Sequence, residues 1–175
     1  AMIAMFSPFI FVLALSFGIN KMSAGTAQLT FWAFAAVMGV SMSSIFLMYT
    51  GGSIARIFFI TMIMFASLSA WGYTTKRNLG AMGTFLFMGL IGLIVAMVVN
   101  MFLQSGAMSF AISVIGVLIF AGLTAWDTQK IKEGYDNVSH ECVLVKKGAI
   151  MGSLSLYLDF LNMFLFMLRL FGNRI

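Results

Sequence analysis

Long apolar segments separated by short polar breaks run through the whole chain. The segments long enough to form helices are about 2–19, 29–49, 54–74, 83–103, 109–130 and 149–172. A helix that crosses a bilayer needs roughly 20 apolar residues, so these lengths suit membrane spans, and the first is the shortest. Strands are not expected, because an open sheet edge leaves backbone groups unsatisfied in lipid. The pattern predicts an all-α integral membrane protein, a polytopic helical bundle with a single transmembrane domain over residues 1–175.

The composition places the same chain in the lipid bilayer. Hydrophobic residues make up 62% of it and charged residues 9%, and the mean hydropathy is +1.05. A soluble domain is about half apolar and a quarter charged. The net charge of +5 is therefore expected to reflect loop topology and contact with anionic lipid, with no role in binding nucleic acid. The single cysteine, Cys142, excludes an internal disulfide.

The basic residues divide unequally between the two sides of the predicted membrane. One side carries Lys21, Lys76, Arg77, Lys130, Lys132, Lys146 and Lys147. The other side carries Arg56, Arg169 and Arg174. Lys and Arg favour the cytoplasmic side, so we expect the polar loop 131–148 to be cytoplasmic. Both chain ends then lie outside, provided that the first and last segments cross fully; a re-entrant last segment would move the carboxyl end to the cytoplasm.

Two of the five acids fall inside predicted helices. Asp127 lies in LTAWDTQKIK, close to the polar loop, and Asp159 lies in LYLDFLN, 12 residues past Lys147. At about 1.5 Å per residue, Asp159 is roughly 18 Å along its helix, near the middle of the membrane. An acid there costs about 2.5–3.5 kcal/mol on insertion scales, so a functional role is the default interpretation.

Both aspartates share helix faces with other polar residues. On the last helix the polar face holds residues spaced by 4, 3 and 7 positions: Ser155, Asp159, Asn162 and Arg169. On the preceding helix Thr124 shares a face with Asp127. If these faces meet, the two carboxylates approach each other, and in a dry site such a pair can share a proton.

A carboxylate pair can act as a pH sensor or as a cation ligand. Carboxylate oxygens suit Ca²⁺, but two of them form a sparse shell. We therefore expect Asp127 and Asp159 to hold Ca²⁺ only weakly and transiently, with no other cofactor. Two alternatives stay open. Asp127 could pair locally with Lys130 or Lys132, and Asp159 could be a buried contact that fixes helix packing.

Enzymatic chemistry finds little support in the sequence. The one histidine, His140, lies in the polar loop, and neither an HExxH motif nor a Cys/His cluster is present to bind zinc. The aspartates lie in AWDTQ and YLDFL, which differ from the YD and GxGD signatures of intramembrane aspartyl proteases. We expect no enzymatic activity.

Several of these segments resemble one known family. TAWDTQKIK (124–132) and GSLSLYLDFLNMFLFMLRLFG (152–172) resemble the carboxyl-terminal half of the Bax inhibitor-1 family, the transmembrane Bax inhibitor motif proteins. SMSSIFLMYTGGSIARIFFIT (41–61) and YTTKRNLGAMGTFLFMGLIG (73–92) resemble its bacterial YccA-like branch. The resemblance implies a seven-helix fold with the last helix at the centre, so the six helices predicted here would lack the first. It also implies a bacterial inner membrane location with the carboxyl end outside.

The resemblance also implies roles for the acids. In the family, paired acids form a pH-sensitive latch in a calcium leak pathway, and their motifs match here at Asp127 and Asp159. In relatives, a basic residue near the cytoplasmic end of the second helix can pair with the first acid. This chain has Gly18 there and then Lys21, so Lys21 is the candidate partner.

Three functions follow as hypotheses. The first is a pH-sensitive calcium or cation leak channel gated by the aspartate pair. The second is a non-conducting regulator of an FtsH-type AAA membrane protease or of another membrane partner, with the loop 131–148 as a contact. The third is a proton-coupled transporter, for which the sequence names no substrate.

Overall fold

The structure is a computed structural model that describes residues 21, 23–137 and 142–175. The predicted segment 2–19 lies outside the described residues. The helices are α2 (Ala24–Met42), α3 (Ile45–Met48), α4 (Gly51–Thr74), α5 (Gly80–Leu103), α6 (Gly106–Asn137) and α7 (Cys142–Phe171). Within the described residues no strand forms, and five helical segments are long and apolar enough to cross a membrane. The predicted all-α, polytopic class is confirmed.

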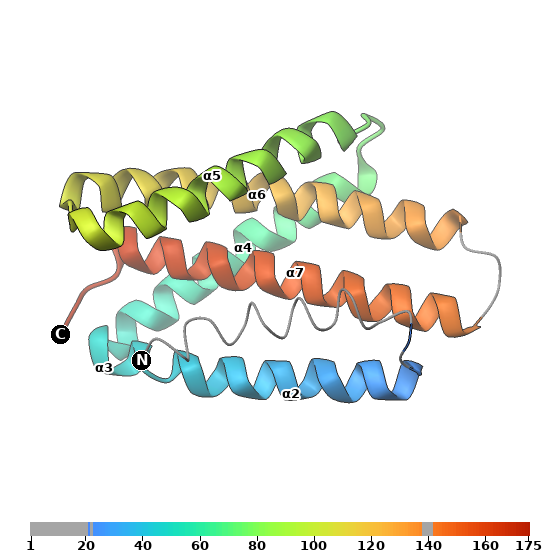
Figure 1. Ribbon diagram of the computed structural model, residues 1–175, viewed down its shortest axis with the longest axis horizontal. Coiled ribbons are helices and arrows are strands. Elements are labelled where there is room, and N and C mark those ends of the chain that lie inside the picture. The colour runs from blue at the N-terminus through green and yellow to red at the C-terminus, as the bar shows by residue number, and fades with distance from the viewer. Residues whose placement is uncertain (1–20, 22, 138–141) are drawn as a thin grey trace.

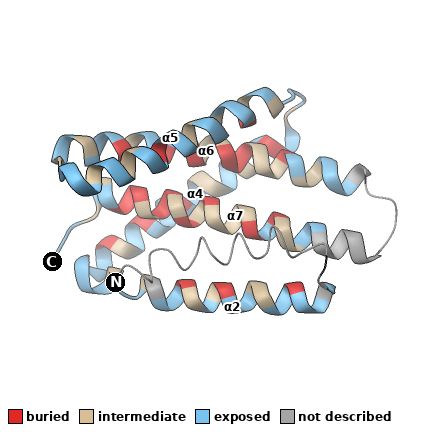
Figure 2. Ribbon diagram, in the orientation of Figure 1, coloured by how far each residue is buried: buried red, intermediate tan, exposed pale blue. Residues whose placement is uncertain are grey.

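Helix α7 occupies the centre of the bundle. In Figure 1 it runs between α2 on one side and α5 with α6 on the other, while α4 crosses behind it. It packs against α2, α4 and α6. In its membrane-spanning stretch, 44% of the residues are buried, against 6% in the corresponding stretch of α5. Figure 2 shows the same contrast, with buried positions gathered on α6 and α7. The family resemblance implied this central position for the last helix.

Both apolar clusters that the described residues form include residues of α7. Met163 and Leu168 lie in the larger cluster, with residues from α4, α5 and α6. Leu154 and Leu161 lie in the smaller one, against Phe34 of α2. Membrane helices associate through close packing and not through exclusion of water. The position of α7 therefore depends on contacts with α2, α4 and α6 at once.

The polar loop predicted over 131–148 is much shorter in the structure. Helix α6 continues to Asn137 and α7 already begins at Cys142. The loop was predicted from hydropathy, which measures the preference of a segment for lipid and does not measure its tendency to form a helix. Lys and Glu are good helix formers, and water can solvate their side chains where a helix leaves the membrane.

The helix predicted over 29–49 begins earlier than expected and is interrupted. Ser23 caps its start, where Ser23 Oγ accepts a bond of 3.3 Å from the backbone N–H of Thr26. The break follows Met42, where Ser43 Oγ donates to the carbonyl of Val40 at 2.6 Å. Such side-chain bonds compete with the helical backbone ladder, which explains why α3 is a separate short helix.

Glycines allow α6 to approach its neighbours closely. A Cβ atom placed on Gly72 of α4 would lie 2.3 Å from the carbonyl oxygen of Ala125 on α6. Gly83 of α5 faces the indole of Trp126, where a Cβ would lie 2.2 Å from the ring. Small residues at helix contacts allow such approach in membranes. The two contacts involve Ala125 and Trp126, so they hold α6 against α4 and α5 directly before Asp127.

The carboxyl-terminal residues are tied back to the start of α4. The backbone N–H of Thr50 donates to the carbonyl of Asn173 at 3.0 Å, and that of Ile175 donates to the carbonyl of Met48 at 3.0 Å. The N–H of Asn173 donates to Ser53 Oγ at 2.9 Å. These bonds hold the end of α7 at one end of the bundle.

Candidate functional site

The two membrane aspartates meet between α6 and α7. Asp159 is 5% exposed, and the side chain of Asp127 lies within hydrogen-bonding reach of its carboxyl group. In the described part of the chain, no donor reaches the buried Oδ2 of Asp159. Ionised carboxylates only accept hydrogen bonds. A bond between these two groups therefore requires a proton on one of them.

Aromatic contacts hold α7 in place around Asp159. Phe160, the next residue, packs edge to face against Phe58 and Phe65 of α4, with ring centroids 5.5 and 5.4 Å apart. Tyr157 packs in the same way against Phe34 of α2 at 6.2 Å. Each such pair adds about 0.5–1.5 kcal/mol beyond burial. The contacts restrict rotation of α7 and so fix the direction in which Asp159 points.

The threonines beside Asp127 donate to their own helix. Thr124 is fully buried, and its Oγ1 donates to the carbonyl of Phe120 at 2.7 Å. Thr128 Oγ1 donates to the carbonyl of Thr124 at 2.8 Å. Threonine commonly satisfies its hydroxyl in this way inside helices. Each of these hydroxyl protons is therefore engaged by a backbone carbonyl, away from the carboxyl pair.

The rest of the predicted polar face on α7 does not converge on the pair. Ser155 and Asn162 are half-buried, and Asn162 Nδ2 donates to the carbonyl of Leu158 at 2.8 Å. Arg169 is exposed, with its guanidinium 5.7 Å from the centre of the Phe166 ring. It lies ten residues beyond Asp159, roughly 15 Å along the helix.

The basic side chains that were candidates to pair with Asp127 make other contacts or are exposed. Lys130 lies over the ring of Trp126 at 5.0 Å. Lys132 lies over Tyr73 at 4.7 Å and donates to the Tyr73 carbonyl at 2.9 Å. Lys21 is exposed. Among the described residues, the ionisable side chain that interacts with Asp159 is Asp127. The pair is therefore acid with acid.

The side chains around the pair offer a cation few ligands. No group of three or more His, Cys, Asp or Glu side chains comes together in the described residues. Ca²⁺ usually takes six to eight oxygens. Two carboxyl groups alone do not complete the coordination shell of a tightly held Ca²⁺.

Sequence reasoning did not single out Gln129, which is buried two residues after Asp127. Its Oε1 accepts from the N–H of Leu79 at 2.9 Å, and its Nε2 donates to the carbonyl of Arg77 at 2.7 Å. The side chain thus ties α6 to the connection between α4 and α5. An amide at the end of an apolar span indicates a buried hydrogen bond. The sequence does not identify the partners, because they lie 50 and 52 positions away.

The fold and the carboxyl pair define a multi-pass helical membrane protein with an ionisable site at its centre. The family model described as "Inhibitor of apoptosis-promoting Bax1" matches residues 1–174. The chain belongs to the Bax inhibitor family.

Named relatives support this assignment. The chain is 47% identical over 164 residues to "Inner membrane protein YbhL" of Escherichia coli (strain K12), covering 93% of this chain and 70% of that protein. It is 49% identical over 172 residues to "Uncharacterized protein RP147" of Rickettsia prowazekii, covering 98% and 72%. It is 45% identical to "Uncharacterized protein YrjE" of Lactococcus lactis, covering 94% and 69%.

Proposed function

We propose that this protein forms a pH-sensitive leak path for Ca²⁺ or other cations, with Asp127 and Asp159 as its gate. The observation that carries the proposal is the contact between two carboxyl groups at the interface of α6 with the central helix. The roles that the family resemblance implies for these two positions also support it. In this reading the protein is an inner-membrane protein whose polar segment 131–148 faces the cytoplasm.

The proton that bridges the two acids would hold the path closed. While it is present, one carboxyl donates to the other, and α6 stays against α7. Without it, two like charges lie close together where the surroundings are poorly polarisable, and they repel strongly. A population of molecules would then shift toward a form in which the helices separate.

The separated carboxylates could then serve a passing cation. Conduction requires sites that bind an ion weakly enough to release it. Two carboxylates provide attraction for Ca²⁺ without completing its coordination shell. Occupancy of the site would therefore be transient, and the same two side chains would serve as gate and as binding site.

The direct test measures Ca²⁺ entry into proteoliposomes loaded with a fluorescent indicator, scanned in pH around neutrality. We compare the wild-type protein with the Asp127→Asn, Asp159→Asn double variant. The matched control is Glu133→Gln, which removes an exposed acid from the same helix. Wild type and control should show flux that varies with pH, whereas the double variant should show flux that does not.

Two results would contradict the proposal. The first is an unchanged pH dependence in the double variant, which would exclude the pair as the gate. The second is the absence of flux from correctly folded wild-type protein at every pH. That outcome would favour the non-conducting regulator, for which co-purification with an FtsH-type protease is the corresponding measurement.

A further inference from the structure

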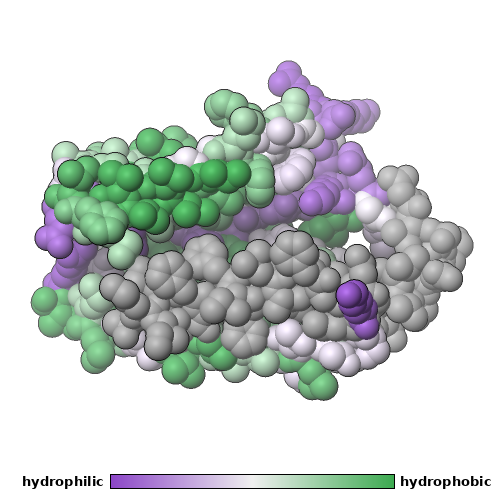
Figure 3. Space-filling view, in the orientation of Figure 1, coloured by the Kyte–Doolittle hydropathy of each residue, from purple (hydrophilic) through white to green (hydrophobic). Residues whose placement is uncertain are grey.

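A second polar site lies beside the connection between α4 and α5. A cavity of about 320 Å³ opens there. Its lining residues are Tyr73, Thr75, Lys76, Arg77, Asn78, Gln129, Lys132 and Glu133. Three of these side chains are cationic and one is anionic, so the lining carries a net charge of +2. Figure 3 shows hydrophilic side chains gathered at this corner, against the apolar surface of α5.

The backbone around this cavity is held in one shape by side-chain bonds. Gln129 bonds the N–H of Leu79 and the carbonyl of Arg77. Thr75 Oγ1 accepts from the N–H of Arg77 at 3.3 Å, and Asn78 Oδ1 accepts from the N–H of Gly80 at 2.9 Å. A ligand that binds here meets a frame that is already ordered, which lowers the entropy lost on binding.

The cationic groups remain able to bind an anion. Lys132 donates one of its three ammonium hydrogens to the carbonyl of Tyr73, and this bond fixes the amine at the cavity wall. Lys76 and Arg77 are exposed. The guanidinium of arginine matches the oxygens of a phosphate in a two-bond geometry. All three side chains line the same cavity, and together they supply the positive charge that attracts a phosphate.

Exposed aromatic residues beside the cavity are typical of the level of lipid head groups. Trp71 and Tyr73 are exposed near the end of α4, and Tyr73 also lines the cavity. Trp and Tyr concentrate where the membrane meets water. Basic pockets at this depth bind the head groups of anionic lipids.

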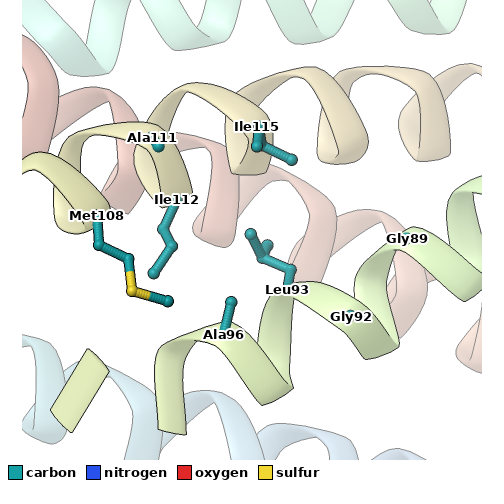
Figure 4. A pocket seen from close by; sticks show the side chains of 8 residues that line it. All are labelled: Gly89, Gly92, Leu93, Ala96, Met108, Ala111, Ile112 and Ile115. Atoms are coloured by element: carbon teal, nitrogen blue, oxygen red, sulfur yellow. The ribbon is translucent and has the colours of Figure 1, made fainter. Parts of the chain in front are cut away.

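A second hollow among the described residues has a different character. It is a groove of about 320 Å³ between α5 and α6, and the side chains that line it in Figure 4 are all apolar. They are Gly89, Gly92, Leu93, Ala96, Met108, Ala111, Ile112 and Ile115. Nothing in this lining would recognise a polar ligand, so the two hollows are chemically distinct.

We propose that the basic pocket of Lys76, Arg77 and Lys132 binds a phosphate group, as presented by an anionic phospholipid head group or by a soluble phosphate. The pocket combines positive charge, an ordered frame and a depth at the membrane surface. It does not depend on the conduction proposed above, since none of its cationic residues contacts the carboxyl pair.

The test compares binding to full-length purified protein by native mass spectrometry and by thermal stability in detergent. The probes are phosphatidylglycerol, phosphatidylcholine and inorganic phosphate. The variant is Lys76→Gln with Arg77→Gln, and the matched control is Arg56→Gln with Arg169→Gln, which removes two exposed positive charges at other places. Phosphatidylglycerol should bind the wild type and the control, and should bind the variant roughly tenfold or more weakly, because each basic contact at a membrane surface adds substantially to affinity.

The three probes distinguish the sources of the phosphate. Binding of phosphatidylglycerol that inorganic phosphate does not displace supports a lipid site. Stabilisation by inorganic phosphate that the variant loses supports a soluble ligand. Equal binding of phosphatidylcholine, or an equal loss in the control, would overturn the proposal.

A structural effect of the substitution is tested separately. Lys76→Arg with Arg77→Lys keeps both charges and should retain most of the binding, and circular dichroism should be unchanged in every variant. Failure of this exchanged variant to bind, with its fold intact, would also overturn the proposal.

Discussion

At the scale of single residues, Asp159 is the most consequential side chain. It is almost fully buried, and its partner is another acid. Isolated carboxyl groups are costly in such surroundings unless they are paired or carry a proton. A proton shared with Asp127 would account for a carboxyl group inside the central helix, and we therefore predict that the stability of the bundle is sensitive to pH.

The first residue-scale prediction concerns this sensitivity. The thermal stability of the purified protein should fall as the pH rises, because loss of the shared proton removes the bond between the two acids and leaves two like charges side by side. Asp159→Asn should flatten that profile, since an amide does not titrate but can still donate to Asp127. Glu133→Gln serves as the control and should keep the wild-type profile. A flat profile for the wild type would contradict the prediction.

The second residue-scale prediction concerns Gln129. Gln129→Ala leaves the N–H of Leu79 and the carbonyl of Arg77 without their bonds. A buried polar group that loses its partner costs about 1–3 kcal/mol, so the free energy of unfolding should fall by roughly that amount. Chemical denaturation in detergent measures it. Gln28→Ala is the matched control on the exposed side of α2, and an equal loss there would refute the role of Gln129.

At the scale of helices, glycine contacts decide how closely α6 approaches its neighbours. Gly72 is the tightest case with a backbone partner, because a Cβ there would overlap the carbonyl of Ala125. Backbone atoms cannot move aside as a flexible side chain can. The close approach of α4 to α6 beside Asp127 therefore depends on a residue of α4 that carries no side chain.

A substitution tests this dependence on helix approach. Gly72→Ala should separate α4 from α6 and lower stability by about 1–3 kcal/mol, as overpacking usually does. Gly92→Ala on α5 is the control, because nothing lies within 4 Å of a Cβ placed there, and alanine favours helix by about 0.5–1 kcal/mol. Thermal unfolding of the two variants should shift in opposite directions. A neutral Gly72→Ala would mean that the helices can adjust at no cost.

Much of the helical layout could be predicted from the sequence, because each span must supply enough apolar residues to cross lipid. The two aspartates were also predictable as candidates, since charges are rare in such spans. The interruption after Met42 and the extension of α6 to Asn137 were not. The interruption depends on hydrogen bonds from serine side chains to the backbone, and the extension is a helical segment outside the apolar span. Hydropathy predicts neither feature. Contacts between distant residues, such as Gln129 with Leu79, carry no local pattern.

At the scale of the whole molecule, the orientation in the membrane remains a prediction from the basic residues. In a Cys142→Ser background, Glu133→Cys should react with an impermeant thiol reagent from the cytoplasmic side, and Arg174→Cys should react from the outside. Both residues are exposed. Labelling of both positions from one side would indicate that the last segment re-enters the membrane without crossing it.

The central position of α7 has a consequence for how the bundle is assembled during synthesis. The ribosome makes α7 after α2 to α6, yet α7 contributes to both apolar clusters. The earlier helices can enter the membrane, but the space between α2 and α6 stays without its protein neighbour until α7 arrives. Proteins that fold as they are made usually complete their amino-terminal parts first. A chain released before α7 would keep the contacts of α4 and α5 with α6, but it would lack the helix that joins α2 to them.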